Sequence, residues 1–174
     1  LGYLTDFSRL NRRMHNKSFT ADNQVTIVGG RNIGDEYFDA GQATSFVDLD
    51  VLAVGAVVPR VSADFDRYWA SASAYPVASL LPATGPQALA ELARRAAQVR
   101  ANPAADPYLA ALAQSDFVRR LVAGELALEW PDVRLVSDPP GKGLGQIGPK
   151  AQFPMRLNEK LGRPAQELLL VSPY

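Results

Sequence analysis

The beginning of the chain shows the strand-favouring residues and the alternation of apolar and polar positions that β-strands produce. Residues 14–21 and 25–28 are rich in side chains that favour strands, and Asp22 and Asn23 between them form a pair typical of tight hairpin turns. We therefore predict two adjacent antiparallel strands joined at this turn, followed by a helical turn at residues 33–38.

A third strand and a long helix are expected next. Residues 46–55 alternate at first, which places Asp48 and Asp50 on the face opposite their apolar neighbours. From residue 57 to 72, apolar side chains recur every three or four positions, and Pro59 lies in the first turn, where a helix tolerates it. This amphipathic helix is expected to cover the sheet.

The remainder of the chain is predicted to be mostly helical, after a linker at residues 75–86 that proline and glycine punctuate. Helices are predicted at residues 87–101, 107–113, 115–124 and 151–161. Short apolar runs at residues 127–130, 133–136 and 167–172 are predicted strands, and residues 137–149 a loop. The apolar faces of the helices between residues 87 and 123 are more typical of core packing than of a bilayer surface.

Composition excludes several classes of protein. The 174 residues are 47% hydrophobic and 21% charged, as in folded globular domains and unlike disordered chains. Eighteen basic side chains balance eighteen acidic ones, so no global positive field attracts nucleic acid. A local basic cluster remains at Arg9, Arg12, Arg13 and Lys17. Cysteine is absent, which excludes disulfides and thiolate metal sites. No apolar run reaches the roughly 20 residues of a transmembrane helix, so membrane contact would be peripheral.

Candidate chemistry is concentrated in one motif, H-x-K-x4-D-x6-G-G-x-N. It consists of His15, Lys17, Asp22, Gly29, Gly30 and Asn32. His15 is the only histidine, and its spacing from Lys17 on an extended segment directs both side chains to one face. A neutral imidazole attacks phosphorus when cations and hydrogen-bond donors stabilise charge on the phosphoryl oxygens. We expect Lys17 and Asn32 to supply these donors, and the two glycines to allow close approach of a ligand.

This motif resembles the HKD motif of the phospholipase D superfamily, whose usual form is H-x-K-x4-D-x6-G-S-x-N. The flanking sequence resembles bacterial cardiolipin synthases of the C type, at residues 1–11, 32–38, 48–51, 65–69 and 168–174. The resemblance covers nearly the whole chain and is densest in residues 1–76. Gly30 departs from the pattern, because serine is usual at this position, so one hydroxyl near the phosphate is missing.

The resemblance implies an α/β fold, with a phospholipase D-like mixed sheet flanked by helices, present here as a partial copy with a helical connecting region. It also implies a bacterial phosphatidyltransferase or phosphodiesterase that acts on phospholipid through a phosphohistidine intermediate. His15 would be the nucleophile, Lys17 and Asn32 would bind phosphate, and no metal or cofactor would take part. The protein would be peripheral to the inner membrane or cytoplasmic.

The second ring nitrogen of His15 requires an acceptor that fixes the tautomer and stabilises the imidazolium. Asp50 and Asp48 both qualify, and the resemblance favours an acidic residue on the strand after the motif. We expect Asp50 to be this acceptor, with Asp48 as the second choice. The alternative is that the carboxylate only completes hydrogen bonds at a strand edge. Asp22 completes the motif, but its place in a turn favours bracing the hairpin over proton transfer.

Three segments are expected along the chain. They are a first HKD-bearing module at residues 1–76 that is incomplete at its N-terminus, a helix-rich connecting region at 77–165, and the opening strand of a second half at 166–174. A first residue other than Met and a strand-like run at the end favour a piece of a longer protein, and a processed chain is equally compatible. Exchange through phosphohistidine needs a general acid and then a base, so a chain with one histidine is expected to be inactive alone.

Three hypotheses about function stay open. The first is that the chain is the part of a two-motif cardiolipin synthase that carries the first motif. Such an enzyme moves a phosphatidyl group to a hydroxyl of another phospholipid. Its second motif would lie elsewhere in the parent chain. The second is a one-motif phosphodiesterase or nuclease that completes its site as a homodimer, against which stands the absence of a basic bias. The third is a non-enzymatic fragment that associates through exposed sheet edges.

A second glycine motif has a simpler interpretation. Residues 143–148 match the dinucleotide-binding pattern G-x-G-x-x-G. However, prolines stand on both sides of it, whereas dinucleotide binding requires a tight turn from a strand into a helix. We therefore predict a mobile loop.

Overall fold

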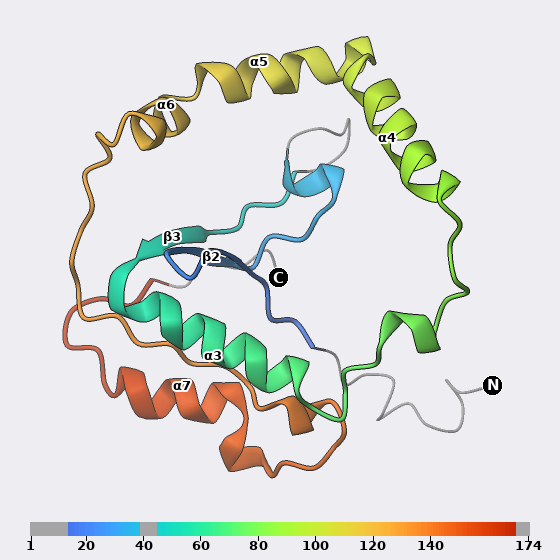
Figure 1. Cartoon of the computed structure of the whole chain (residues 1–174). Helices are drawn as coiled ribbons and strands as arrows, with labels where there is room; N and C mark the ends of the chain where they lie inside the picture. The colour runs from blue at the N-terminus through green and yellow to red at the C-terminus, as the bar shows by residue number, and fades with distance from the viewer. Residues whose placement is uncertain (1–13, 39–44, 170–174) are drawn as a thin grey trace. The chain divides into compact units, whose positions relative to one another are not determined.

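A computed structural model describes residues 14–38 and 45–169, and these residues divide into two compact units (Figure 1). The first unit holds the described residues up to Tyr75 together with those from Val133 onward, and the second is Pro76–Asp132. The first unit has different bounds from the first expected segment. It includes residues 133–165, which were expected in the helix-rich connecting region. The assignment of segments to halves of a longer protein stays a prediction.

The first unit contains an antiparallel sheet of order β1-β2-β3, formed by β1 (Ser18–Ala21), β2 (Val25–Gly29) and β3 (Asp50–Val54). Asp22, Asn23 and Gln24 join β1 to β2, and the first two have φ angles of 51° and 54°, the left-handed conformation that a tight hairpin turn requires. The predicted hairpin is therefore confirmed. Two predicted strands are too long, because residues 14–17 and 46–49 lie outside the strands.

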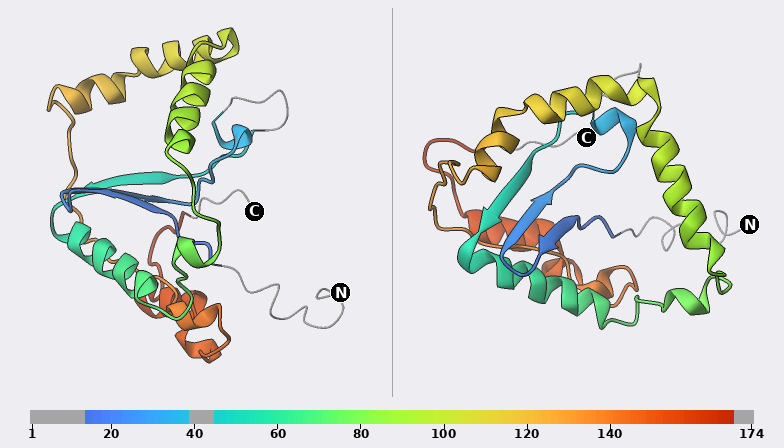
Figure 2. Two further views of the ribbon diagram at one scale, coloured as in Figure 1. Left: turned by 45° about the vertical axis from the view of Figure 1, so that its right-hand side comes forward. Right: turned by 45° about the horizontal axis from the view of Figure 1, so that its top comes forward.

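One face of the sheet is covered by α3 (Val58–Trp69), as Figure 2 shows and as the amphipathic pattern predicted. Thr26 on β2 is only 1% exposed, and its hydroxyl lies 2.9 Å from that of Thr20 on β1. Val58 and Val61 are 1% and 4% exposed. Because side chains alternate along a strand, the even-numbered residues of β1 and β2 face this helix.

The opposite face carries the odd-numbered residues of β1 and β2. Phe19 and Ile27 are register partners there, and their exposed fractions are 70% and 39%. The alternation continued backwards from β1 places Lys17 and His15 on the same side as Phe19. The motif therefore lies on the face of the sheet that α3 does not cover.

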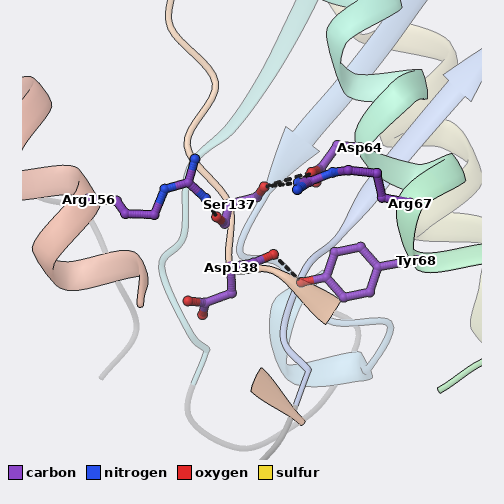
Figure 3. A network of polar contacts seen from close by, with 6 residues as sticks. All are labelled: Asp64, Arg67, Tyr68, Ser137, Asp138 and Arg156. Atoms are coloured by element: carbon purple, nitrogen blue, oxygen red, sulfur yellow. Dashed lines mark hydrogen bonds and ion pairs between the residues drawn. The ribbon is translucent and has the colours of Figure 1, made fainter. Parts of the chain in front are cut away.

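The later part of the first unit is held to α3 by polar contacts at Ser137 and Asp138 (Figure 3). This part contains the short turns η5 (Pro140–Lys142) and η6 (Pro149–Ala151) and the helix α7 (Phe153–Leu161). The helix predicted at 151–161 is confirmed, and it ends at Gly162 with φ of 61°.

One predicted strand in this region is wrong, and another is tested only in part. Residues 133–136 form no strand, because prolines flank the run, and the carbonyl of Ser137 accepts from the Arg156 side chain instead of a neighbouring strand. Residues 167–169 form none either, and the rest of the strand predicted at 167–172 lies outside the described residues. The loop predicted at 137–149 contains η5 and turns, and the glycine motif is followed by the single 3-10 turn η6 rather than by an α-helix, which agrees with rejecting a dinucleotide site.

The second unit is helical, as predicted. It contains η3 (Val77–Ser79), α4 (Gln87–Arg100), η4 (Pro103–Ala105), α5 (Asp106–Gln114) and α6 (Asp116–Val122). Ser115 caps α6 as expected, since its hydroxyl accepts from the backbone N–H of Val118 at 3.4 Å. The strand predicted at 127–130 is absent. The expected core packing of α4 is also not found, because its apolar side chains Leu89, Leu92 and Val99 are 63–74% exposed.

Among the described residues, no helix is both long enough and apolar enough to cross a membrane. The architecture is thus mixed α/β, with a small antiparallel sheet and five α-helices in the part of the chain that the structure describes.

Candidate functional site

The structure brings His15 and Lys17 together just before β1. The Nζ atom of Lys17 lies 3.0 Å from Nδ1 of His15 and also donates to the His15 carbonyl oxygen at 3.1 Å. His15 is exposed and Lys17 is half-buried. The expected pairing of an imidazole with a cation on one face is therefore present.

The contact with Lys17 determines which ring nitrogen of His15 carries the proton. A lysine ammonium has hydrogens to donate and no acceptor, so Nδ1 must be the acceptor and a neutral ring holds its proton on Nε2. For Nε2 to act as a nucleophile, the Lys17 ammonium has to move from Nδ1 to another acceptor. A phosphoryl oxygen bound beside the ring is such an acceptor.

The two glycines of the motif make room for two carboxylates, one at the start of β3 and one just before it. A Cβ atom on Gly29 would lie 2.7 Å from Cγ of Asp50 and 2.9 Å from its Cα. A Cβ atom on Gly30 would lie 2.7 Å from Oδ1 and 2.8 Å from Cγ of Asp48. These separations are shorter than real Cβ contacts, so a side chain at position 29 would meet backbone and one at position 30 would force the Asp48 carboxylate to move. The space expected for a ligand beside these glycines is thus occupied by Asp48 and Asp50.

Arg31, between the glycines and Asn32, holds three parts of the site together. Its Nε atom donates to Oδ2 of Asp50 at 2.8 Å, Nη1 donates to the carbonyl of Tyr37 at 2.5 Å, and Nη2 donates to the carbonyl of Asp48 at 3.1 Å. The guanidinium also lies over the Phe38 ring, 5.7 Å from its centroid. Sequence reasoning assigned Arg31 no such role, because the partners of an arginine depend on a tertiary arrangement.

Asn32 is positioned by Tyr37, from the short helical turn η1 (Asp35–Tyr37). Its Nδ2 atom donates to the Tyr37 hydroxyl at 2.8 Å. Tyr37 is 4% exposed, and its ring lies 5.3 Å from that of Phe46. Sequence reasoning missed Tyr37 as a site residue, although the helical turn predicted directly after the motif was a signal for it.

The two candidate acceptors for His15 have different surroundings. Asp50 is engaged by the Arg31 guanidinium, and both side chains are about one-third exposed. Asp48 is 9% exposed; its Oδ1 accepts from the backbone N–H of Leu49 at 2.8 Å, and its Oδ2 is buried and has no partner within the described residues. The choice of Asp50 over Asp48 stays a prediction.

Asp22 lies in the exposed hairpin turn, on the other side of β1 from His15 in the sequence. Arg9, Arg12 and Arg13 of the predicted basic cluster lie outside the described residues. Across residues 14–38 and 45–169, no three His, Cys, Asp or Glu side chains gather where they could hold a metal ion.

Comparison with known proteins shows which proteins the chain is similar to. No family model matches the chain, and no solved structure matches it significantly. The whole chain is 45% identical to cardiolipin synthase C of Escherichia coli (strain K12) and covers 37% of that protein. An uncharacterized protein of Helicobacter pylori (strain ATCC 700392 / 26695) is 48% identical over 77 residues, which are 44% of this chain and 15% of that protein.

Cardiolipin synthase 1 of Staphylococcus epidermidis is 32% identical over 68 residues, which are 39% of this chain and 14% of that protein. The chain thus spans well under half the length of each of these relatives. The similarity to two cardiolipin synthases agrees with the motif and its flanks. These similarities support a cardiolipin synthase-like protein of the phospholipase D superfamily.

Proposed function

We propose that this chain carries the first-motif part of a two-motif phosphatidyltransferase that forms cardiolipin from phospholipids. The observation that supports this most directly is the 3.0 Å contact between the His15 ring and the Lys17 ammonium. It lies in a chain 45% identical, over its full length, to a cardiolipin synthase. The sheet and α3 would belong to a larger phospholipase D-like mixed sheet flanked by helices.

The first chemical step transfers a phosphatidyl group to the enzyme. A ring nitrogen of His15 forms a bond to phosphorus, and the bond from phosphorus to the leaving headgroup oxygen breaks. Lys17 moves from Nδ1 to a phosphoryl oxygen, where its charge stabilises the transition state. The leaving alkoxide takes its proton from the second histidine of the pair, which must come from outside these 174 residues.

The second step passes the phosphatidyl group to a hydroxyl of another phospholipid. The second histidine, now deprotonated, removes the proton of that hydroxyl as its oxygen attacks phosphorus, and the bond to His15 breaks. Asn32 binds a phosphoryl oxygen in both steps, and Tyr37 orients its amide. A carboxylate of β3, Asp50 by preference, accepts from the ring once Lys17 has left Nδ1. Because both substrates are lipids, the protein would work at the membrane surface.

A chimera with the relative tests this proposal. The aligned segment of Escherichia coli cardiolipin synthase C is replaced by residues 1–174 of this chain, and cardiolipin formation is measured. We expect activity in the chimera, and its abolition by His15→Ala with the fold intact. Lys17→Ala should lower the rate about 10²–10³-fold, the loss typical of removing one oxyanion donor.

Lys150→Ala is the matched control, since Lys150 is an exposed lysine of η6 away from the motif. Its chimera should keep the full rate. Near-parent turnover of the His15→Ala chimera would remove His15 as the nucleophile. A folded chimera that makes no cardiolipin would contradict the proposed substrate.

A further inference from the structure

Helix α4 presents an apolar face that stays open in the part of the chain that the structure describes. Leu89, Leu92, Ala96 and Val99 recur every three or four residues and therefore share this face. The two leucines and the valine are 74%, 63% and 66% exposed, and Ala96 is exposed as well. A helix with such an apolar stripe buries it against a partner. The partner of this face must come from outside the described residues.

The charged side chains of α4 are mostly arginines. The helix contains Arg94, Arg95 and Arg100 but a single acidic residue, Glu91. The Glu91 carboxylate accepts from Nε of Arg94 at 2.8 Å and from Nε of Arg95 at 2.7 Å. Three arginines against one glutamate leave α4 with an excess of two positive charges. The rest of the second unit has five acidic and two basic side chains, so α4 is the positive part of an otherwise negative unit.

Two of the arginines border the apolar face. Arg95 precedes Val99 by four residues and Arg100 follows Ala96 by four, so each arginine is a surface neighbour of an apolar side chain. Arginine lays its methylene stem along apolar surface while its guanidinium reaches a polar layer. An apolar face with arginines at its borders suits the boundary between the acyl chains and the phosphate groups of a membrane.

The length of α4 fits a position parallel to a membrane surface rather than across it. The helix is continuous over 14 residues (Figure 1). At 1.5 Å per residue it is about 21 Å long, whereas the hydrocarbon core of a bilayer is roughly 30 Å thick. Anionic headgroups would attract the excess positive charge of the helix, which an uncharged apolar groove would not do.

We propose that α4 docks the protein on a membrane that contains anionic phospholipids. The face formed by Leu89, Leu92, Ala96 and Val99 lies among the acyl chains at the membrane surface, and the arginines of α4 lie at the level of the phosphates. The proposal rests on the proposed function for the chemistry of the partner, a phospholipid, but it concerns binding and not turnover.

Binding of the whole chain to vesicles tests this proposal. One set of vesicles contains equal parts of phosphatidylglycerol, which is anionic, and phosphatidylcholine; the other contains phosphatidylcholine alone. Sedimentation separates bound from free protein. We expect clear binding to the anionic vesicles and much weaker binding to the neutral ones, because the arginines attract anionic headgroups. No binding to either set, or equal binding to both, would overturn the proposal.

Replacement of two leucines tests the apolar face. Leu89→Gln combined with Leu92→Gln should weaken binding at least about tenfold, because the burial of two leucines is lost. Glutamine has nearly the helix propensity of leucine, so the helix should persist. Leu168→Gln combined with Leu169→Gln is the matched control, because these leucines are 48% and 77% exposed and lie in the first unit. Wild-type binding by the α4 variant, or an equal loss in both variants, would contradict the proposal.

Replacement of two arginines tests the charge. Arg95→Gln combined with Arg100→Gln should weaken binding to the anionic vesicles about fivefold for each arginine. Arg60→Gln combined with Arg163→Gln changes the net charge equally, at exposed positions of the first unit, and should bind like wild type. If both pairs weaken binding equally, the overall charge attracts the protein and α4 does not.

The orientation of α4 can be measured with a fluorophore, since the chain has no cysteine of its own. Ala96→Cys and Gln98→Cys are each labelled with nitrobenzoxadiazole, whose emission shifts to the blue in apolar surroundings. The two exposed positions lie roughly 160° apart around the helix, on its apolar and polar sides. Anionic vesicles should shift the emission at position 96 and leave it unchanged at position 98. Equal responses would contradict the proposed orientation, even if a leucine variant fails to fold.

A second copy of the chain is the competing partner for this face. Light scattering without lipid should give the same molar mass for wild type and for the variant with both Leu89→Gln and Leu92→Gln. If wild type is a dimer and this variant a monomer, a second copy covers the face and the proposal is wrong. Failure of this proposal is distinct from failure of the proposed function, because vesicle binding involves no turnover and cardiolipin formation is measured separately in the chimera.

Discussion

Gly30 differs from the serine usual in the superfamily, and the structure gives a physical reason. The carboxylate of Asp48 fills the position where a side chain on residue 30 would begin. Asp48 is 9% exposed, so it has little room to move aside. Glycine here and a buried aspartate just before the next strand form a complementary pair, which the sequence alone does not reveal because it depends on how β3 pairs with β2.

We predict that Gly30→Ala lowers the free energy of unfolding by about 1–3 kcal/mol, the usual cost of overpacking a filled site. Urea denaturation measures this cost. Gly148→Ala is the control, because nothing lies within 4 Å of a Cβ there and its φ of −73° suits alanine. Adding Asp48→Ala to Gly30→Ala should recover part of the loss. Equal stability of Gly30→Ala and Gly148→Ala would contradict the complementary pair.

Ionisation of Tyr68 is predicted to lower the stability of the fold at alkaline pH. Burial raises its pKa above the ordinary 10.0; Asp64 and Asp138 raise it further, while Asn16 and Arg67 lower it. A raised pKa means that the folded state favours the neutral phenol. Its contribution to stability is therefore complete below 10.0 and is lost as the pH rises through the raised pKa.

From about pH 9 to about pH 11, the range around the ordinary tyrosine value, wild type should lose more stability than Tyr68→Phe. Denaturant titrations at several pH values measure the difference. Tyr75→Phe should follow the wild-type curve. Parallel curves for wild type and Tyr68→Phe would show that the Tyr68 hydroxyl does not favour its neutral form in the fold.

At the scale of elements, sequence patterns predict those parts whose partners are close in the chain. The hairpin follows from Asp22 and Asn23, which adopt the positive φ angles that the turn needs. Helix α3 follows from its apolar spacing. The run at 133–136 has strand-like residues but pairs with no strand in the described part of the chain, so periodicity alone gave a wrong prediction.

The same distinction applies to the site, where contacts between close neighbours in the sequence were predictable and contacts between distant residues were not. Spacing of two on an extended chain was enough to bring His15 and Lys17 together. The roles of Tyr37 and Arg31 could not be predicted, because they depend on how η1 and β3 return to the end of β2. The contacts of Arg31 and Tyr37 join residues 5 to 19 positions apart and obey no simple period.

We predict that the side chain of Arg31 stabilises the fold by joining β2, η1 and β3. Arg31→Gln removes an ion pair and hydrogen bonds from a charged group, so the free energy of unfolding should fall by roughly 1.5–3 kcal/mol. Thermal or urea unfolding measures this fall. Arg94→Gln on exposed α4 should change stability little. If the two variants are equally stable, Arg31 does not hold these elements together.

At the scale of the whole molecule, the chain has one histidine. All 174 of its residues align with a cardiolipin synthase, of which they cover 37%. A lipid headgroup leaves as an alkoxide and needs a proton from a second histidine, so the isolated chain should not turn over phospholipid. A nitrophenyl phosphodiester has a leaving group that departs as a stable anion and needs no such acid. It therefore tests the attack by His15 without the second histidine that the proposed mechanism requires.

The most direct measurement is mass spectrometry of this chain after incubation with bis(p-nitrophenyl) phosphate. The account predicts release of nitrophenolate and a matching mass increase on the peptide that contains His15, as a bond from nitrogen to phosphorus replaces the bond to nitrophenolate. His15→Ala should abolish the adduct and Lys17→Ala should slow it. A folded chain without an adduct, or with the adduct on another residue, would contradict the account.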